Sequence, residues 1–140
     1  MEKRILFVVR DRAMREHLAH TFCNLGFRVA TASDGVSGLF QFGLRQPHLI
    51  VLDLNGWETL QRIRTLSNTP IIALIEDTLE ARLESLDRGA DFFLVRPPSV
   101  SELEARIHVL LRRDPAMLNG VAAMPERTQD LTDLSVPLGI

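Results

Sequence analysis

The stretch LIVLDLNGWETL, residues 49–60, decides the fold, because its periodicity changes around a single carboxylate. Residues 49–52 form an unbroken apolar run, which is typical of a strand covered on both faces. From Trp57 onward, apolar residues return every three or four positions, as on one side of a helix. Asp53 stands at the junction. A strand followed at once by a helix is the unit from which parallel sheets are built.

The same change of periodicity recurs along most of the chain. Helical stripes that predict an inward face are Met14, Leu18, Phe22 and Leu25; Val36, Leu39 and Phe40; Trp57, Leu60 and Ile63; Leu79, Leu83 and Leu86; and Val100, Leu103, Ile107 and Leu110. We predict strands over 4–9, 27–31, 48–53, 70–75 and 91–95, and helices over 12–25, 34–45, 56–66, 77–88 and 99–112. Right-handed crossovers then give an α/β fold, a doubly wound sheet of five parallel strands with helices on both faces.

Residues suited to helix ends support these boundaries. Glycines favour the left-handed turn that closes a helix, and short polar side chains cap the next one. The closing residues are Gly26 and Gly89, and the opening residues are Ser33 or Asp34, Asn55, Asp77 and Ser99.

Length and composition suit one domain with a tail. The chain has 140 residues and is 46% hydrophobic, enough for one core but too short for two ordinary domains. We expect an ordered domain over 1–113. Residues 114–140 contain three prolines and two glycines without a sustained period, which predicts a poorly structured tail or a truncated linker.

The charge balance excludes a strong global field. With 16 basic and 18 acidic residues, the chain has no positive net charge that would attract nucleic acid or an anionic membrane surface. The first apolar run is too short to span a membrane. The single cysteine, Cys23, lies within an amphipathic pattern, so we expect a small buried thiol and a cytoplasmic protein.

Residues that could carry chemistry follow the predicted strands. Ligands of an open parallel sheet gather beyond the carboxyl ends of its strands. The residues placed there are Arg10, Asp11, Asp53, Ile75, Glu76, Arg96 and Pro97. A central carboxylate such as Asp53 can serve as a nucleophile, a metal ligand or a helix cap.

Five features match one family in order and spacing. Beside the strand and helix alternation, these are VLDLN (51–55), TPIIAL (69–74), LDRGADFFLVRPPS (86–99) and ELEARIHVLLRR (102–113). Over residues 3–113 the chain resembles the receiver domain of bacterial two-component response regulators, particularly the OmpR/PhoB subfamily. The resemblance implies a flavodoxin-like sheet of strand order 2-1-3-4-5 and a signalling module that is not an enzyme. It also implies that Asp53 accepts a phosphoryl group from a histidine kinase, and that the Arg96-Pro97 peptide is cis.

Several positions depart from the family's pattern. The acidic pair that holds Mg²⁺ in the family corresponds to Val9 and Arg10, neither of which can bind the ion. Asp11, one residue further on, is a weaker candidate for that role. The family's hydroxyl residue after the fourth strand corresponds to Ile75, or to Leu74 if the gap lies elsewhere.

The remaining pocket positions are partly retained. The aromatic switch position is Phe93, without a phenolic group, and the phosphate-gripping lysine corresponds to Arg96. The connection after Asp53 is shorter than in the family by about four or five residues, because Asn55 leads directly to the helix-opening glycine. Trp57 is expected to pack with Leu60 and Ile63 on the inner side of its helix.

These departures lead to the central hypothesis. If Arg10 and Arg96 both point at Asp53, the carboxylate is held in charge-assisted hydrogen bonds and is a poor nucleophile. The chain would then be an atypical receiver that interacts with proteins independently of Mg²⁺-dependent phosphorylation, without a cofactor or metal. The alternative is a conventional phosphoacceptor that binds Mg²⁺ and is phosphorylated on Asp53. A flavin or nucleotide enzyme is disfavoured, because VVRDRAM (8–14) lacks a phosphate-cradling glycine.

The expected output surface follows the subfamily's twofold dimer face, on the fourth helix, fifth strand and fifth helix. Family pairing implies Arg82 with Glu102 and Asp91 with Arg106, around an apolar centre. The residues of this face are Arg82, Leu83, Leu86, Asp91, Phe92, Glu102, Ala105 and Arg106. The expected partners are proteins, among them a histidine kinase, another regulator or a second copy. No motif of a DNA-binding domain is present, so we expect no direct nucleic-acid binding.

Overall fold

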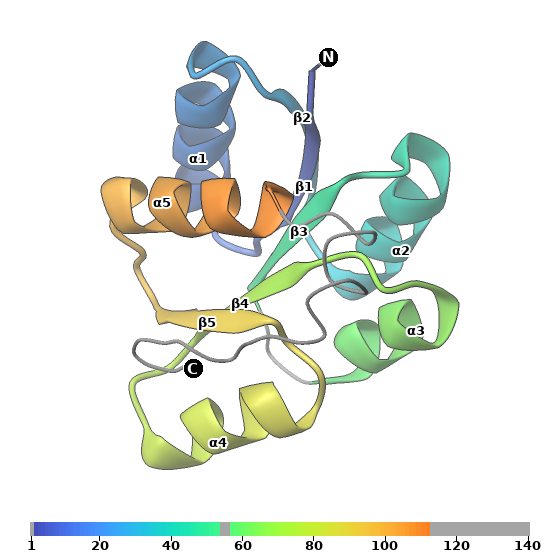
Figure 1. The fold of residues 1–140 in the computed structure, drawn as a ribbon, viewed down its shortest axis with the longest axis vertical. Helices are drawn as coiled ribbons and strands as arrows, with labels where there is room; N and C mark the ends of the chain where they lie inside the picture. The colour runs from blue at the N-terminus through green and yellow to red at the C-terminus, as the bar shows by residue number, and fades with distance from the viewer. Residues whose placement is uncertain (1, 54–56, 113–140) are drawn as a thin grey trace. The chain divides into compact units, whose positions relative to one another are not determined.

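The computed structural model describes residues 2–53 and 57–112, and within them the predicted sheet is confirmed. Five strands pair in the order β2-β1-β3-β4-β5, and every neighbouring pair is parallel (Figure 1). The strands are β1 (Arg4–Val8), β2 (Arg28–Ala32), β3 (Leu49–Asp53), β4 (Ile71–Ile75) and β5 (Phe92–Val95). Each lies within one residue of its predicted bounds at either end.

Five helices alternate with the strands, as predicted. They are α1 (Arg12–Asn24), α2 (Gly35–Arg45), α3 (Glu58–Leu66), α4 (Leu79–Asp87) and α5 (Val100–Leu111). The chain divides into two units, Met1–Ile107 and His108–Ile140, and the whole sheet belongs to the first. The predicted tail, 114–140, lies outside the described residues. No helix among the described residues is long and apolar enough to cross a membrane.

Helix ends follow the polar and glycine signals with one shift. The Asp34 carboxylate accepts the Ser37 backbone N–H at 2.8 Å at the start of α2. At α4 the cap is Thr78, not Asp77, because the Asp77 carboxylate pairs with Arg82 instead. Asn55 lies outside the described residues. Gly26 and Gly89 adopt φ of 100° and 109°, the left-handed region where a side chain is strained.

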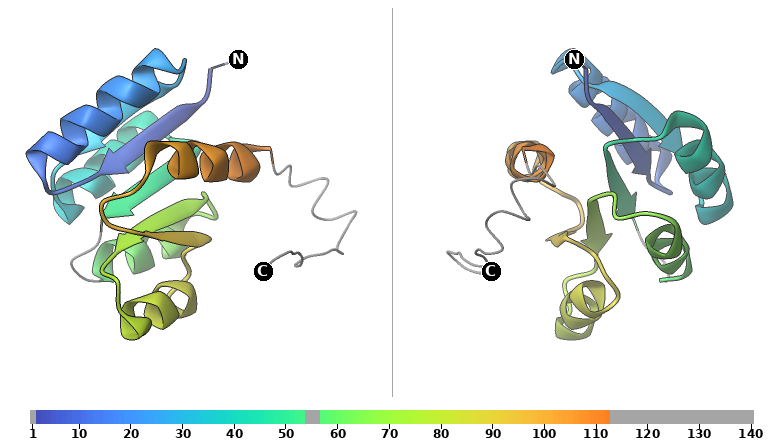
Figure 2. Two further views of the ribbon diagram at one scale, coloured as in Figure 1. Left: turned by 90° about the vertical axis from the view of Figure 1, so that its left-hand side faces the viewer. Right: turned by 45° about the vertical axis from the view of Figure 1, so that its right-hand side comes forward.

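Helices lie on both faces of the sheet (Figure 2), and an apolar layer lies between the sheet and the helices on each face. The layer toward α2, α3 and α4 contains alternate strand residues, such as Leu6, Val8 and Leu52, packed with Leu60 and Ile63 of α3. The opposite layer uses the intervening strand residues. There α1 packs its Phe22 ring 5.4 Å from that of Phe7, centroid to centroid. Burial on both faces explains why the strands have unbroken apolar sequences.

Several sequence predictions about burial are wrong. Leu25, predicted on the inner side of its helix, is 45% exposed after the end of α1. Cys23 is exposed, because the buried side of α1 is formed by Leu18 and Phe22 and the next residue is turned away from it. Val36 and Phe40 are 83% and 66% exposed. The reason is that α2 is apolar on nearly all sides, so periodicity alone did not reveal which side faces the sheet.

The leucines of α4 also point outward. Leu79, Leu83 and Leu86 are 70%, 63% and 52% exposed, whereas Ser85 is buried and Ala81 packs on the core. Small residues face the sheet here because α4 packs close to it. This exposure agrees with the assignment of Leu83 and Leu86 to an interaction face.

Candidate functional site

Asp53 ends β3 at the carboxyl edge of the sheet, and its carboxylate pairs with a single cation among the described residues. Nη1 of Arg96 donates a hydrogen bond to Oδ1 of Asp53. The Asp53 side chain is 7% exposed and that of Arg96 is 24% exposed. A charge-assisted contact between groups this little hydrated is stronger than a surface ion pair.

The position of Arg96 follows from the register of β5. Ile75 pairs with Val95, and the Arg96 backbone N–H then donates to the Ile75 carbonyl at 2.9 Å. The Arg96-Pro97 peptide is cis, as the resemblance implied. Nη2 of Arg96 also lies 3.7 Å from the Glu76 carboxylate, but that side chain is 74% exposed and the contact is weak.

Three residues after β1 differ in what they offer the site. Val9 is fully buried hydrocarbon, and Arg10 is exposed. Asp11 caps α1: its carboxylate accepts the Met14 backbone N–H at 2.8 Å and so stabilises the start of the helix. Arg15 donates to the Val9 carbonyl at 2.9 Å, adding a second cation to this turn. Such a donor set does not fit Mg²⁺, which needs several oxygen ligands.

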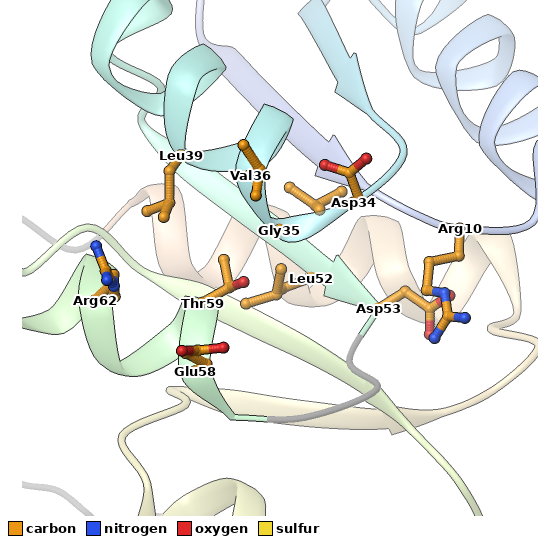
Figure 3. Close-up of a pocket in the computed structure, with 11 residues that line it drawn as sticks. Arg10, Asp34, Gly35, Val36, Leu39, Leu52, Asp53, Glu58, Thr59 and Arg62 are labelled. Atoms are coloured by element: carbon orange, nitrogen blue, oxygen red, sulfur yellow. The ribbon is translucent and has the colours of Figure 1, made fainter.

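Arg10 and Arg96 differ in their contact with the Asp53 carboxylate. Arg10 lines the same cavity as Asp53, and Figure 3 draws both at one end of it. In the described part of the chain, however, Arg96 forms the ion pair with Asp53 and Arg10 does not. The expectation of two arginines on one carboxylate is therefore met by Arg96 alone.

A cavity of about 710 Å³ extends from Asp53 between α2 and α3. It is lined by Val8, Arg10, Asp34, Gly35, Val36, Leu39, Leu52, Asp53, Glu58, Thr59 and Arg62. The helices approach closely here, since a Cβ on Gly35 would lie 2.2 Å from Oγ1 of Thr59.

Sequence reasoning missed the α3 part of this wall, which is formed by Glu58, Thr59 and Arg62. These are ordinary polar helix residues, and only the contact between α2 and α3 brings them to the cavity. The glycine at the start of α2 was the available signal, because close helix approach favours glycine.

Two further predicted positions, Ile75 and Phe93, pack on the core. Ile75 is 2% exposed at the end of β4, and its hydrocarbon belongs to the core. Phe93 is partly buried against the same core and stacks on Phe92, with centroids 6.0 Å apart. Neither side chain offers a hydrogen bond to the cavity. Trp57 packs on the core with Leu60 and Ile63, as predicted.

On the predicted dimer face, three of the four charged residues have partners within the chain. Arg82 pairs with Asp77, and Asp91 accepts Nη2 of Arg64 at 2.5 Å. The Arg106 guanidinium lies 4.0 Å from the centroid of the Phe92 ring, a cation–π contact. Glu102 and Ala105 are exposed on α5. The family pairings join different copies, so these contacts leave the dimer a prediction.

Metal-ligating side chains do not gather elsewhere in the described chain. Within residues 2–53 and 57–112, no three His, Cys, Asp or Glu residues are placed to hold an ion.

Comparison with known proteins identifies relatives of most of the chain. The family model for the response regulator receiver domain matches residues 5–108. The chain is 37% identical over 139 residues to the response regulator MprA of Mycobacterium tuberculosis, covering 94% of this chain and 60% of MprA. It is 40% identical to the probable transcriptional regulator ycf27 of Cyanophora paradoxa, covering 80% of this chain and 49% of that protein.

Comparison with solved structures finds the same fold in other response regulators. The receiver domain of the Francisella response regulator 1452 has a TM-score of 0.75 and 29% identity, covering 80% of this chain and 98% of that domain. A putative response regulator from Chloroflexus aurantiacus has the same fold, with a TM-score of 0.74 at 24% identity, covering 81% and 100% of the two chains. The chain spans about half the length of the first curated relatives it matches. It belongs to the receiver domains of two-component response regulators.

Proposed function

We propose that this receiver works as a protein-interaction module without Mg²⁺-dependent phosphorylation of Asp53. The single observation that carries the proposal is the ion pair from Arg96 to the Asp53 carboxylate. An aspartate must present a free oxygen to attack a phosphoryl group. A carboxylate held by a guanidinium, with one oxygen engaged, is a poorer nucleophile than a free one.

The residues after β1 support the same proposal. Phosphoryl transfer relies on a metal ion to neutralise charge on the transferred group. Here a buried valine and an exposed arginine stand where the family has its acidic pair, and Asp11 is used as a helix cap. Arg10 adds positive charge to the cavity, which would repel a divalent cation.

The residue at the end of β4 supports the proposal that this receiver does not respond to phosphorylation. A hydroxyl that donates to a bound phosphoryl group couples it to conformational change in the family. Ile75 has no donor and is buried in the core. A phosphoryl group on Asp53 would therefore lack that contact.

A conventional phosphoacceptor is the second candidate, and one observation favours it. Arg10 is exposed and does not pair with Asp53, so the carboxylate is held from one side only. Rotation of Arg96 would free it, and the same arginine could then grip the phosphoryl oxygens. In that case Mg²⁺ would be required and Asp53 would be phosphorylated by a histidine kinase.

Chemical phosphorylation distinguishes the two candidates. The chain is incubated with acetyl phosphate and Mg²⁺, and intact mass is measured; beryllofluoride with Mg²⁺ is tested in parallel by Trp57 fluorescence. We expect no stoichiometric phosphoprotein and no saturable change in emission. A phosphoprotein that is lost in the Asp53→Asn variant would contradict the proposal and establish the alternative.

A matched variant tests the reason for inactivity. Arg10→Asp restores one acidic side chain of the pair at an exposed position, so folding should be unaffected. If the cation is what excludes the metal, this variant gains Mg²⁺ binding and some acetyl phosphate labelling. The control Arg12→Asp changes an exposed arginine that is not among the residues lining the cavity, and it should gain neither.

The interaction surface that we propose is the α4–β5–α5 face, in a homodimer or with another regulator or a kinase. Exposed Leu83 and Leu86 beside Arg82 and Arg106 give an apolar centre with a charged rim. A variant in which both Arg82 and Arg106 are replaced by Glu should no longer retain protein partners in a pull-down. The control variant Arg12→Glu should still retain them. The proposed location is the cytoplasm, where an exposed free thiol such as Cys23 stays reduced.

A further inference from the structure

The outer side of α2 carries an apolar stripe that the fold does not use. Val36, Phe40 and Leu44 are 83%, 66% and 59% exposed. Residues four apart lie on the same side of a helix, so these three form one continuous row. The opposite side of the helix, with Leu39 and Phe42, packs on the core. We call the row of Val36, Phe40 and Leu44 the α2 stripe.

The size of the α2 stripe sets it apart from scattered surface residues. Isolated exposed apolar residues are normal, but a contiguous patch of a few hundred Å² marks an interaction site. A phenylalanine and two aliphatic side chains with these exposures present on the order of 300 Å². The stripe runs from the cavity beside Asp53, which Val36 lines, to the far end of the helix at Leu44.

We propose that the α2 stripe binds the α2 stripe of a second copy of this chain, with the two helices antiparallel and a twofold axis at Phe40. The residue pattern is symmetric about that point, since Val36 and Leu44 each lie four positions from it. A twofold contact needs such self-complementarity. Val36 of each copy then meets Leu44 of the other.

The dipole of α2 also favours the antiparallel orientation. With a twofold axis at Phe40, the amino end of each helix lies beside the carboxyl end of the other, so opposite partial charges are neighbours. A parallel arrangement would place like partial charges together at both ends, which is unfavourable.

Gly43 provides an independent observation. It is exposed, and a Cβ built there would meet nothing within 4 Å. Packing inside the chain therefore does not explain a glycine in a helix, where it is less favourable than alanine. Gly43 lies three positions after Phe40 and Ser37 three before it, so small residues flank the axis and let two helices approach closely.

The buried area fixes the expected strength of the dimer. A stable interface buries about 800 Å² per partner. The α2 stripe offers less than half of that area, so we expect a dissociation constant of the dimer of about 0.1–1 mM. The proposed contact uses no residue that pairs with Asp53, so it does not rest on the proposed function.

Sedimentation of the 140-residue chain up to about 1 mM tests the proposal. We expect reversible dimerisation, and at least a tenfold weaker association for Phe40→Glu. The matched control is Leu66→Glu, which places the same charge at the end of α3 at a residue of similar exposure, 69% against 66%. Circular dichroism establishes that both variants fold. A monomer at every concentration, or association that Phe40→Glu leaves unchanged, would overturn the proposal.

Disulfide trapping tests the orientation without relying on Phe40. In a Cys23→Ser background, Val36→Cys and Leu44→Cys are prepared separately, mixed and oxidised with copper phenanthroline, which accepts the two electrons. The antiparallel pairing predicts a crosslinked dimer from the mixture, and little from either variant alone. Crosslinks within each variant and none between them would show a parallel contact and contradict the proposal.

Discussion

We call the side of the sheet where the strands begin the amino edge, and the side where they end the carboxyl edge. Each carries an arginine–aspartate ion pair, and the two pairs have different roles. At the amino edge, Asp91 accepts Arg64 at 2.5 Å and the Ile71 backbone N–H at 2.8 Å. Arg64 also donates to the Gly89 and Thr69 carbonyls, at 2.8 Å and 2.6 Å. At the carboxyl edge, Asp53 meets Arg96 beside an open cavity.

The difference separates a structural ion pair from one that is available to a ligand. Arg64 and Asp91 connect α3 with the starts of two strands, and their hydrogen-bonding capacity is largely used by backbone groups. Arg96 and Asp53 join side chains at the ends of two strands, beside the cavity. Stability should therefore depend more on the amino edge, and ligand chemistry on the carboxyl edge.

The largest expected effect is at Arg64. Arg64→Ala removes a partly buried cation that donates to the Asp91 carboxylate and to the Gly89 and Thr69 carbonyls. We expect a loss of about 3 kcal/mol in the free energy of unfolding, measured with urea. Arg62→Ala, an exposed arginine on the same helix, is the control and should change it by less than about 0.5 kcal/mol. Equal effects of the two variants would remove the distinction between the edges.

A smaller effect is expected for the carboxyl-edge pair. Arg96→Gln should lower the unfolding free energy by about 1–2 kcal/mol at neutral pH, because it leaves the buried Asp53 carboxylate without its cation. Adding Asp53→Asn should recover much of this loss, since no charge then remains to be paired. A double-mutant cycle in urea measures the coupling. Additive effects of the two substitutions would contradict an energetically significant pair.

A pH-dependent contribution is expected at the amino edge, from His48. Its Nδ1 accepts the Arg4 backbone N–H at 2.9 Å, and burial, followed by the charges of Arg4 and Lys3, lowers its pKa below 6.5. The folded state thus favours the neutral ring. Its contribution is complete above pH 6.5 and is lost as pH falls through the lowered folded pKa.

The measurement compares thermal midpoints between pH 8 and pH 5 for the wild type and for His48→Gln. We expect the advantage of the wild type to shrink as the solution is acidified. A difference that stays constant over this range would mean that protonation of His48 is not linked to folding.

The smallest effect on stability is expected at Arg10. This residue is exposed and lines the cavity, so Arg10→Ala should change the unfolding free energy by less than about 0.5 kcal/mol. Its influence should be on ligand charge, visible as altered sulfate or phosphate binding in a titration. A large loss of stability would mean that Arg10 holds the carboxyl edge together.

Much of the site was predictable because strand ends in a parallel sheet converge. Asp53 and Arg96 were expected near each other, and they form an ion pair. The role of Asp11 as a cap and the α3 wall of the cavity were not predicted. Both depend on where a helix begins in space, which side-chain type alone leaves open.

Apolar periodicity fixed the strands and the inner sides of α1, α3 and α5. Unbroken runs such as 49–52 have no exposed side to choose, so their burial follows from composition. Alternation of these runs with amphipathic helices then determined the doubly wound sheet.

Only the tertiary structure decided which side of α2 faces the sheet, and which arginine reaches Asp53. A helix that is apolar all round can bury either side, and in the fold Leu39 and Phe42 are the residues that pack on the core. An arginine side chain is long enough to reach several partners or water, so its contact depends on the backbone position that strand register provides. The burial of unbroken apolar strands follows from local sequence, whereas the buried side of such a helix and the pairing of distant residues do not.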